Sequence, residues 1–225
     1  MSAAETTKTP HIVRHPSQDR ILDVCEQLFA DRGFSGVGLA EVAERAGLSK
    51  SSLFHHFKSK TEIYASVLER LFKRLHEALE AEINVAAGPW AQLDRVVDIW
   101  VGFMADNPNT AKLLLRSMVE RDFEDEGLTR EELARRHGLY MRLIIQRVIV
   151  LMKTGIEQGA FRQQPVGHFV QTLIGATIFH FASGEFGKDM LGGDIFEPRR
   201  VEARKTEMKN FLRHGLGYGP GAKDS

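Results

Sequence analysis

Four cationic side chains and a pair of histidines lie close together near residue 50, in a stretch that holds no carboxylate. Between residues 45 and 61 the sequence carries Arg45, Lys50, Lys58, Lys60, His55 and His56. Positive charge concentrated in this way can bind the phosphate oxygens of a nucleic acid. The whole chain has 30 Lys+Arg and 30 Asp+Glu, so nucleic-acid binding must rest on this local patch. The alternative is a solvated polar surface without a partner.

The positions of two of these lysines favour phosphate binding. Lys50 and Lys60 both fall in the first turn of an expected helix, where the macrodipole disfavours a cation by roughly 0.3–1 kcal/mol. A phosphate docked at each helix start would make both positions favourable. We therefore expect a backbone clamp on either side of a reading helix. The alternative is that both lysines are exposed and screened by water.

The elements that must position these side chains are helices. Apolar residues recur at spacings of three and four, and they do not alternate with polar residues over a strand length. Capping residues are expected at Ser17, Ser49, Ser59 and Thr129. An acidic loop is expected at 121–128 and a flexible loop at 187–193. The pattern predicts an all-α fold of about nine helices, at 17–32, 39–46, 50–56, 59–83, 89–105, 108–120, 129–158, 166–186 and 197–214.

The second and third of these helices are short and are joined by a tight turn. Gly47 permits a positive φ where the chain turns, Leu48 can plug between the helices, and Ser49 caps the second one. This spacing is typical of a helix-turn-helix, although another helical hairpin could share it.

The stretch from Gly36 to Lys60, GVGLAEVAERAGLSKSSLFHHFKSK, resembles the DNA-binding signature of the tetracycline-repressor (TetR) family. The upstream helix from Ile21 to Phe34 fits the same pattern, and the specific resemblance covers about residues 18–65. Two positions depart from the family's usual residues. Gly38 stands where Thr or Ser normally caps the second helix, and Phe54 stands where a Tyr hydroxyl normally reaches a phosphate.

The resemblance implies a role for each matching position. The third helix would lie in the major groove, and Leu53 and Phe57 would belong to the core that holds it. The implied DNA-binding residues are Arg45, Lys50, Ser51, Ser52, His55, His56, Lys58 and Lys60.

The resemblance also implies a homodimer and an internal ligand cavity in the larger part of the chain. The eighth expected helix is apolar almost all round and carries small residues that permit close approach, which favours a dimer over a monomeric core. The expected dimer-interface residues are Phe169, Leu173, Phe181, Val201, Met208, Phe211 and Leu212.

Aromatic and methionine side chains are candidates for the cavity walls, although at helical spacing they also describe ordinary core. His180 is the expected polar contact for a ligand, unless it is hydrogen-bonded inside the core. The pocket candidates are Phe72, Trp100, Phe103, Met104, Met118, Tyr140, Met141, Ile144, Phe179 and His180.

The sequence offers no catalytic signature. It has no nucleophile elbow, phosphate-binding glycine loop or nucleotide fingerprint, and the lone Cys25 lies on an expected buried face. A metal site of His137, His168 and His180 would require the fold to bring them together, so we expect no metal. Because the catalytic and nucleotide-binding motifs are missing, we also expect no cofactor and no enzyme activity. Without a leader or an apolar span, we expect a cytoplasmic protein that does not enter a membrane.

These observations predict four segments: a flexible arm at 1–16, a DNA-binding domain at 17–64, a ligand-binding and dimerisation domain at 65–215, and a flexible tail at 216–225. The expected function is a transcriptional repressor that binds a palindromic operator in double-stranded DNA as a homodimer and is released by a small, mainly apolar effector. The alternatives are a DNA-binding architectural or cell-division factor of the same fold without a ligand, and an all-helical enzyme acting on a lipid-like substrate.

Overall fold

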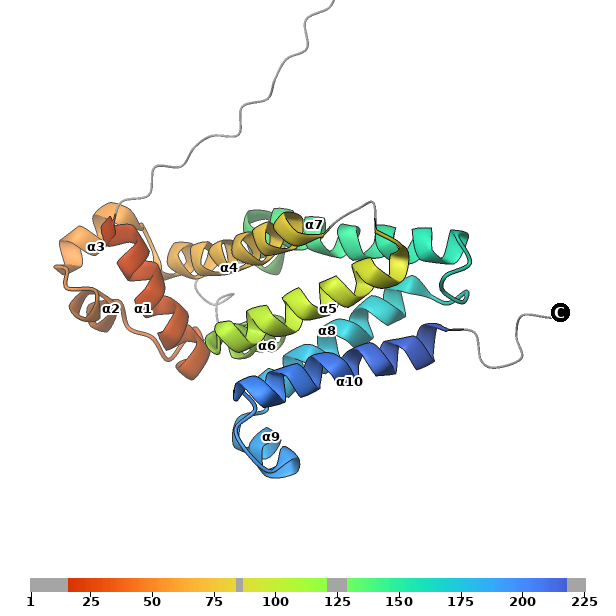
Figure 1. The fold of residues 1–225 in the computed structure, drawn as a ribbon. Coiled ribbons are helices and arrows are strands. Elements are labelled where there is room, and N and C mark those ends of the chain that lie inside the picture. The colour runs from red at the N-terminus through yellow and green to blue at the C-terminus, as the bar shows by residue number, and fades with distance from the viewer. Residues whose placement is uncertain (1–15, 84–86, 121–128, 218–225) are drawn as a thin grey trace, which may run out of the picture.

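The computed structural model describes residues 16–83, 87–120 and 129–217, and within these ranges every regular element is a helix (Figure 1). The all-α prediction is therefore confirmed. The expected arm, the acidic loop at 121–128 and most of the expected tail lie outside the described residues. No helix in the described ranges is long and apolar enough to cross a bilayer.

The described chain contains ten helices rather than the nine expected. Their bounds are α1 Pro16–Arg32, α2 Leu39–Arg45, α3 Lys50–His56, α4 Lys60–Glu82, α5 Pro89–Asp106, α6 Asn109–Val119, α7 Arg130–Glu157, α8 Val166–Ala182, α9 Gly184–Leu191 and α10 Pro198–Leu216. Helix α10 includes Leu216, which is buried, so the tail begins later than predicted.

The additional helix, α9, replaces the flexible loop expected at 187–193. Gly184 has a φ of +56°, which breaks the helix path after α8, and Gly192 at +70° ends α9. Gly187 allows α9 to turn back closely, because a Cβ there would collide with the Ser183 hydroxyl. The several glycines indicated a loop in the sequence, yet each serves a helix boundary or a close approach.

Hydroxyl side chains fix the starts of three helices. Ser49 caps α3, Ser59 caps α4 and Thr129 caps α7, and each accepts a 3.1 Å hydrogen bond from the backbone N–H three residues later. These three predicted caps are confirmed, whereas Ser17 does not precede its helix, because α1 already begins at Pro16. Neighbouring residues in the sequence therefore fix where α3, α4 and α7 begin.

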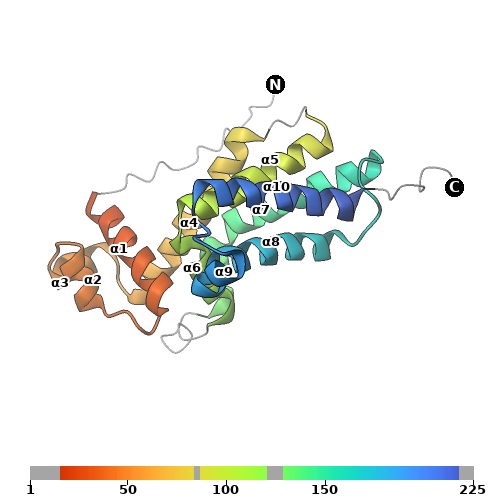
Figure 2. The ribbon, with the colours of Figure 1, turned by 60° about the horizontal axis from the view of Figure 1, so that its bottom comes forward.

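Helix α4 belongs to two packed units at once. Near its start, Tyr64 packs edge-on against Phe29 and Phe34, with ring centroids 5.1 and 5.3 Å away, in the core of α1–α3. Farther along, α4 packs against α7, while α5 contacts α10 and α6 contacts α8. Helices α2 and α3 therefore lie at one end of the molecule, as both ribbon views show (Figures 1 and 2).

Candidate nucleic-acid interface and internal cavity

The connection between α2 and α3 is a closed, tight turn. Gly47 has a φ of +67°, and its backbone N–H donates to the Glu44 carbonyl. The Leu48 N–H then donates to the Ala43 carbonyl at 2.9 Å. On α3, Leu53 has no exposed surface, so this helix is anchored on one side and its other side faces solvent. This is the arrangement that a helix-turn-helix requires.

The outward side of α3 carries the side chains that the sequence singled out. Lys50, Ser51 and His55 are exposed, while Ser52 and His56 are half-buried. Hydroxyl, imidazole and ammonium groups are therefore available together at the end of the molecule. They can donate to phosphates and to base edges in a major groove.

The two departures from the family pattern have visible consequences. Phe54 is 41% exposed on α3, so an apolar ring stands where a hydroxyl is usual. Gly38 precedes α2 without a side-chain cap, and its surroundings are open. Only backbone N–H groups are therefore offered at that helix start.

The cations that flank α3 differ in their exposure and in their contacts with other side chains. Lys58 is exposed, but the Nζ of Lys60 lies 4.3 Å from the centroid of the Phe34 ring. Arg45 pairs with Glu41 at 3.0 Å. The cationic patch therefore has a carboxylate, Glu41, beside it. The stretch considered in the sequence began at residue 45, so it left out Glu41, one helical turn earlier.

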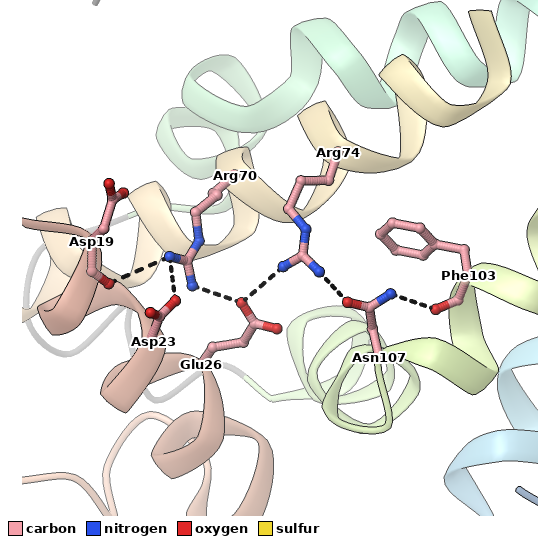
Figure 3. Close-up of polar contacts among 7 residues, drawn as sticks. All are labelled: Asp19, Asp23, Glu26, Arg70, Arg74, Phe103 and Asn107. Atoms are coloured by element: carbon pink, nitrogen blue, oxygen red, sulfur yellow. Dashed lines mark hydrogen bonds and ion pairs between the residues drawn. The ribbon is translucent and has the colours of Figure 1, made fainter. Parts of the chain in front are cut away.

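A network of polar contacts centred on the buried Arg70, which the sequence did not indicate, joins α4 to α1 (Figure 3). The guanidinium of Arg70 donates to Asp23 at 2.7 Å and to Glu26 at 2.8 Å, and it approaches the Asp19 carbonyl at 3.5 Å. Only 7% of Arg70 is exposed. These contacts lock the orientation of α1 against the connecting helix.

The network continues from α4 to the end of α5. Arg74 lies 3.5 Å from Glu26 and also donates to the side-chain oxygen of Asn107. Asn107 in turn donates to the Phe103 carbonyl at 2.8 Å, which satisfies the last turn of α5. Three helices are thus connected by consecutive polar contacts (Figure 3).

A third arginine holds the other end of α1. Arg116 on α6 donates to the carbonyls of Ala30 and Asp31, at 3.0 and 3.1 Å. Its guanidinium also pairs with Glu120, one turn later on α6. The C-terminal end of α1 is therefore attached to a helix of the larger unit.

Helices α4 to α8 line a cavity of about 90 Å³, and the lining side chains are all apolar apart from the indole of Trp100. Met118 is 46% exposed and marks an opening toward the surface at α6. The walls are formed by Phe72, Leu75, Leu79, Val96, Trp100, Leu114, Met118, Met141, Ile144, Ile145, Val148, Val170, Leu173, Ile174 and Ile178.

Five of the ten predicted pocket residues line this cavity. Trp100, Met118, Met141, Ile144 and Phe72 line the cavity, whereas Phe103, Met104, Tyr140, Phe179 and His180 do not. Met104 is fully buried in the core, and Phe179 is 57% exposed. Helical spacing identifies the apolar face of each helix, but it does not say which neighbour that face meets.

The predicted dimer-interface residues differ in their exposure within one protomer. Leu173, Phe181, Val201, Met208 and Leu212 are at most 7% exposed within one chain, so they belong to its own core. Phe169 is half-buried, and Phe211 is 63% exposed. The apolar side chains left exposed on α8 to α10 are Phe179, Phe186, Met190, Leu191 and Phe211.

His180 lies on α8 close to Arg204 of α10 and outside the cavity. Burial, assisted by the Arg204 charge, lowers the pKa of His180 from 6.5 to about 4. The Nε2 atom is buried with no hydrogen-bond partner among the described residues. Arg204 itself donates to the Ala176 carbonyl at 2.8 Å, which ties α10 to α8.

The single cysteine is structural. Cys25 has no exposed surface, and burial raises its pKa to about 12. A thiol in this state is a poor nucleophile. Among the described residues no cluster of histidine, cysteine or acidic side chains could hold a metal ion, and the side chain of His137 lies outside that description.

The helix-turn-helix lies within a region that matches a known family. Residues 21–67 match the profile described as bacterial regulatory proteins, tetR family. Residues 21–67 therefore form a domain of the tetR family of bacterial regulatory proteins. The similar proteins include transcriptional activators and repressors and also the nucleoid occlusion factor SlmA of Marinomonas sp., which is 24% identical over 77% of this chain and 86% of that one. None of these three is named as an enzyme, which agrees with the prediction from the sequence.

Two transcriptional regulators illustrate how far the similarity extends. The chain is 26% identical over 156 residues to the HTH-type transcriptional activator FasR of Mycolicibacterium smegmatis, and the match covers 68% of each chain. It is 32% identical over 83 residues to the HTH-type transcriptional repressor NemR of Escherichia coli, covering 37% of this chain and 41% of that one.

A solved structure of a transcriptional regulator shares the fold. FadR of Bacillus subtilis, in complex with stearoyl-CoA, superposes with a TM-score of 0.68 at 16% identity, covering 86% of this chain and 96% of that one. The likeness therefore extends well beyond the helix-turn-helix into the larger helical unit.

Proposed function

We propose that this tetR-family regulator is a repressor that binds a palindromic operator as a homodimer and is released by a small, mainly apolar effector. The observation that carries this proposal is α3, anchored by the buried Leu53 and exposing Lys50, Ser51 and His55 at one end of the molecule. Residues 17–64 would act on DNA, and residues 65–215 would hold the effector and the second protomer.

The proposed DNA contacts divide by chemistry. Ser51 and His55 would reach base edges in the major groove, because they project from the solvent side of α3. Lys58 would contact backbone phosphates, and it is free to do so because its side chain is exposed. The remaining proposed contacts are Arg45, Lys50, Ser52, His56 and Lys60.

A second copy would cover the apolar face left exposed on α8 to α10. Phe179 and Phe211 are 57% and 63% exposed, which is unusual for aromatic side chains of an isolated protomer. Gly175 on the same helix face has open space around it, so another helix could approach closely. A two-fold dimer would also supply two reading helices for a palindromic site.

The cavity supports an apolar effector, and α6 supports a route from the effector to α1. Leu114 and Met118 line the cavity, while Arg116, between them on α6, holds the end of α1. A ligand that moves α6 would therefore also move α1 and the reading helix. Such a ligand acts only through its different affinity for the two arrangements. The stearoyl-CoA complex of FadR supports an apolar ligand in this fold.

The cavity also favours a ligand-responsive regulator over a same-fold architectural factor that needs no ligand. Five helices contribute to its walls, including the two that carry Arg70 and Arg116. An architectural factor gains nothing from an apolar void connected in this way to its DNA-binding unit. We therefore prefer the repressor.

The proposal is tested by gel retardation of the DNA upstream of the protein's own gene, at low salt. We expect a shifted complex, and Lys58→Ala should weaken binding to all sequences alike and lower the salt slope by about one. Ser51→Ala should instead reduce discrimination between operator and random DNA by about 1–3 kcal/mol. Lys153→Ala, an exposed lysine on α7, is the charge-matched control. A folded dimer that shifts no DNA would overturn the proposal.

A further inference from the structure

One wall residue of the cavity has a hydrogen-bond donor that nothing in the described protein satisfies. Trp100 on α5 is 8% exposed, and its Nε1 atom is buried without an acceptor. A buried N–H group normally finds a partner in the protein or in a bound molecule. Because Trp100 forms part of the cavity wall, an occupant of the cavity is well placed to supply that partner.

The other wall residues limit the chemistry of the occupant. The other fourteen wall residues have aliphatic, phenylalanine or methionine side chains, and none carries a charge. A charged group placed among them would lose its hydration without gaining an opposite charge. The acceptor that meets the indole must therefore be neutral, and a carbonyl oxygen is a neutral acceptor with two lone pairs and no donor of its own that would need a partner.

The flexible part of the wall indicates how an occupant larger than the cavity is admitted. Met118 and Met141 line the side where the walls are partly exposed. Unbranched methionine side chains can move aside to enlarge such a space. The cavity of about 90 Å³ can thus expand near α6 and α7 while Trp100 stays fixed in the core.

We propose that the effector is an apolar molecule bearing an uncharged carbonyl group, and that this carbonyl accepts a hydrogen bond from Trp100 Nε1. This inference rests on the proposed function, because it assigns a ligand class to the effector cavity. Trp100 is then the residue that distinguishes a carbonyl compound from a hydrocarbon of the same shape. Linear esters and ring ketones share this chemistry.

The test uses pairs of probes that differ only in the carbonyl. 2-Nonanone and nonane form the linear pair, and camphor and bornane form the ring pair, so the two arms also separate linear from ring ligands. Binding is followed through the indole N–H signals in ¹H–¹⁵N spectra of the full chain. Trp90, which packs on Phe161 outside the cavity, is the internal control.

We expect at least one ketone to bind roughly 3- to 10-fold tighter than its hydrocarbon and to move the Trp100 signal downfield, with Trp90 unchanged. Trp100→Phe should abolish the preference while both members of the pair still bind. Equal binding within both pairs, a ketone that leaves the Trp100 signal in place, or a preference that survives in Trp100→Phe would overturn the inference.

The spectra of the wild-type chain decide the question even if Trp100→Phe does not fold. Failure of this inference differs from failure of the proposed function. A ketone that binds without moving the Trp100 signal contradicts only the hydrogen bond, and the retardation of operator DNA is unaffected by that result. Absence of binding by all four probes would overturn the inference and the apolar effector together.

Discussion

Arg70 of α4 donates a 2.8 Å hydrogen bond to Glu26 of α1, and both side chains are largely buried, at 8% and 12% exposure. This pair joins α1, which packs in the core of α1–α3, to α4, which continues into the larger helical unit of α4–α10. Arg70 also pairs with Asp23, and Glu26 also pairs with Arg74 (Figure 3). A pair so placed can stabilise the chain and transmit motion at the same time.

Removing one member of the buried pair should be costly. Arg70→Met keeps the aliphatic volume but leaves Glu26 with only the more distant Arg74, so we expect a loss of about 3 kcal/mol in the free energy of unfolding. Urea denaturation measures this. The exposed pair of Arg32 with Glu41 provides the control, and Arg32→Met should cost less than about 1 kcal/mol. Similar losses in the two variants would contradict the assigned importance of Arg70.

Filling the cavity should block the effector without touching DNA contacts. Val148→Phe places a ring in the cavity wall, and we expect it to weaken 2-nonanone binding by about tenfold, or 1.4 kcal/mol. Val150→Phe is the matched control, because Val150 lies two residues away on α7 and is 48% exposed. Calorimetric titration measures both. Equal binding by the two variants would mean that ligands enter elsewhere.

A bulky residue at Gly175 should separate the protomers. The position has open space in one chain, so Gly175→Leu leaves the protomer's fold intact but obstructs a close helix–helix contact. We expect dimer dissociation to become easier by at least about tenfold in analytical ultracentrifugation. Gln146→Leu on α7 changes an equally exposed site away from α8 and α10. A Gly175→Leu dimer as stable as the wild type would place the interface on another face.

The lowered pKa of His180 predicts acid sensitivity. Its folded-state pKa of about 4 lies below the unfolded value of 6.5, so the unfolded chain binds more protons between these values. Stability should therefore be complete above pH 6.5 and fall as the pH drops toward 4, by about 1–2 kcal/mol for this partly exposed ring. His180→Gln should remove this part of the dependence, whereas Thr172→Ala, at an exposed site on α8, should keep it. An unchanged acid slope in His180→Gln would refute the assignment.

Local signals in the sequence predicted local structure well. The caps at Ser49 and Ser59 and the turn at Gly47 depend on neighbouring residues, and the structure confirms them. The outward face of α3 followed from the same short stretch. These features could be predicted because the interactions that fix them lie within a few residues of one another.

Features that depend on distant contacts could not be predicted. Arg70 meets Glu26 across 44 residues, and Arg116 meets Ala30 across 86. The periodicity of α8 marked Leu173 and Phe179 as equally apolar, yet one lines the cavity and the other is exposed. Which apolar face meets its own core, a cavity or a second copy depends on how the helices are arranged.

The most direct test of the central claim is selection of bound fragments from a random DNA library by the purified full chain. The account predicts an inverted repeat whose half-sites lie about one helical turn apart, roughly 34–36 Å or a multiple of it, because two copies of α3 must reach successive major grooves. Recovered fragments that share no repeated half-site, or no retained DNA at low salt, would contradict it.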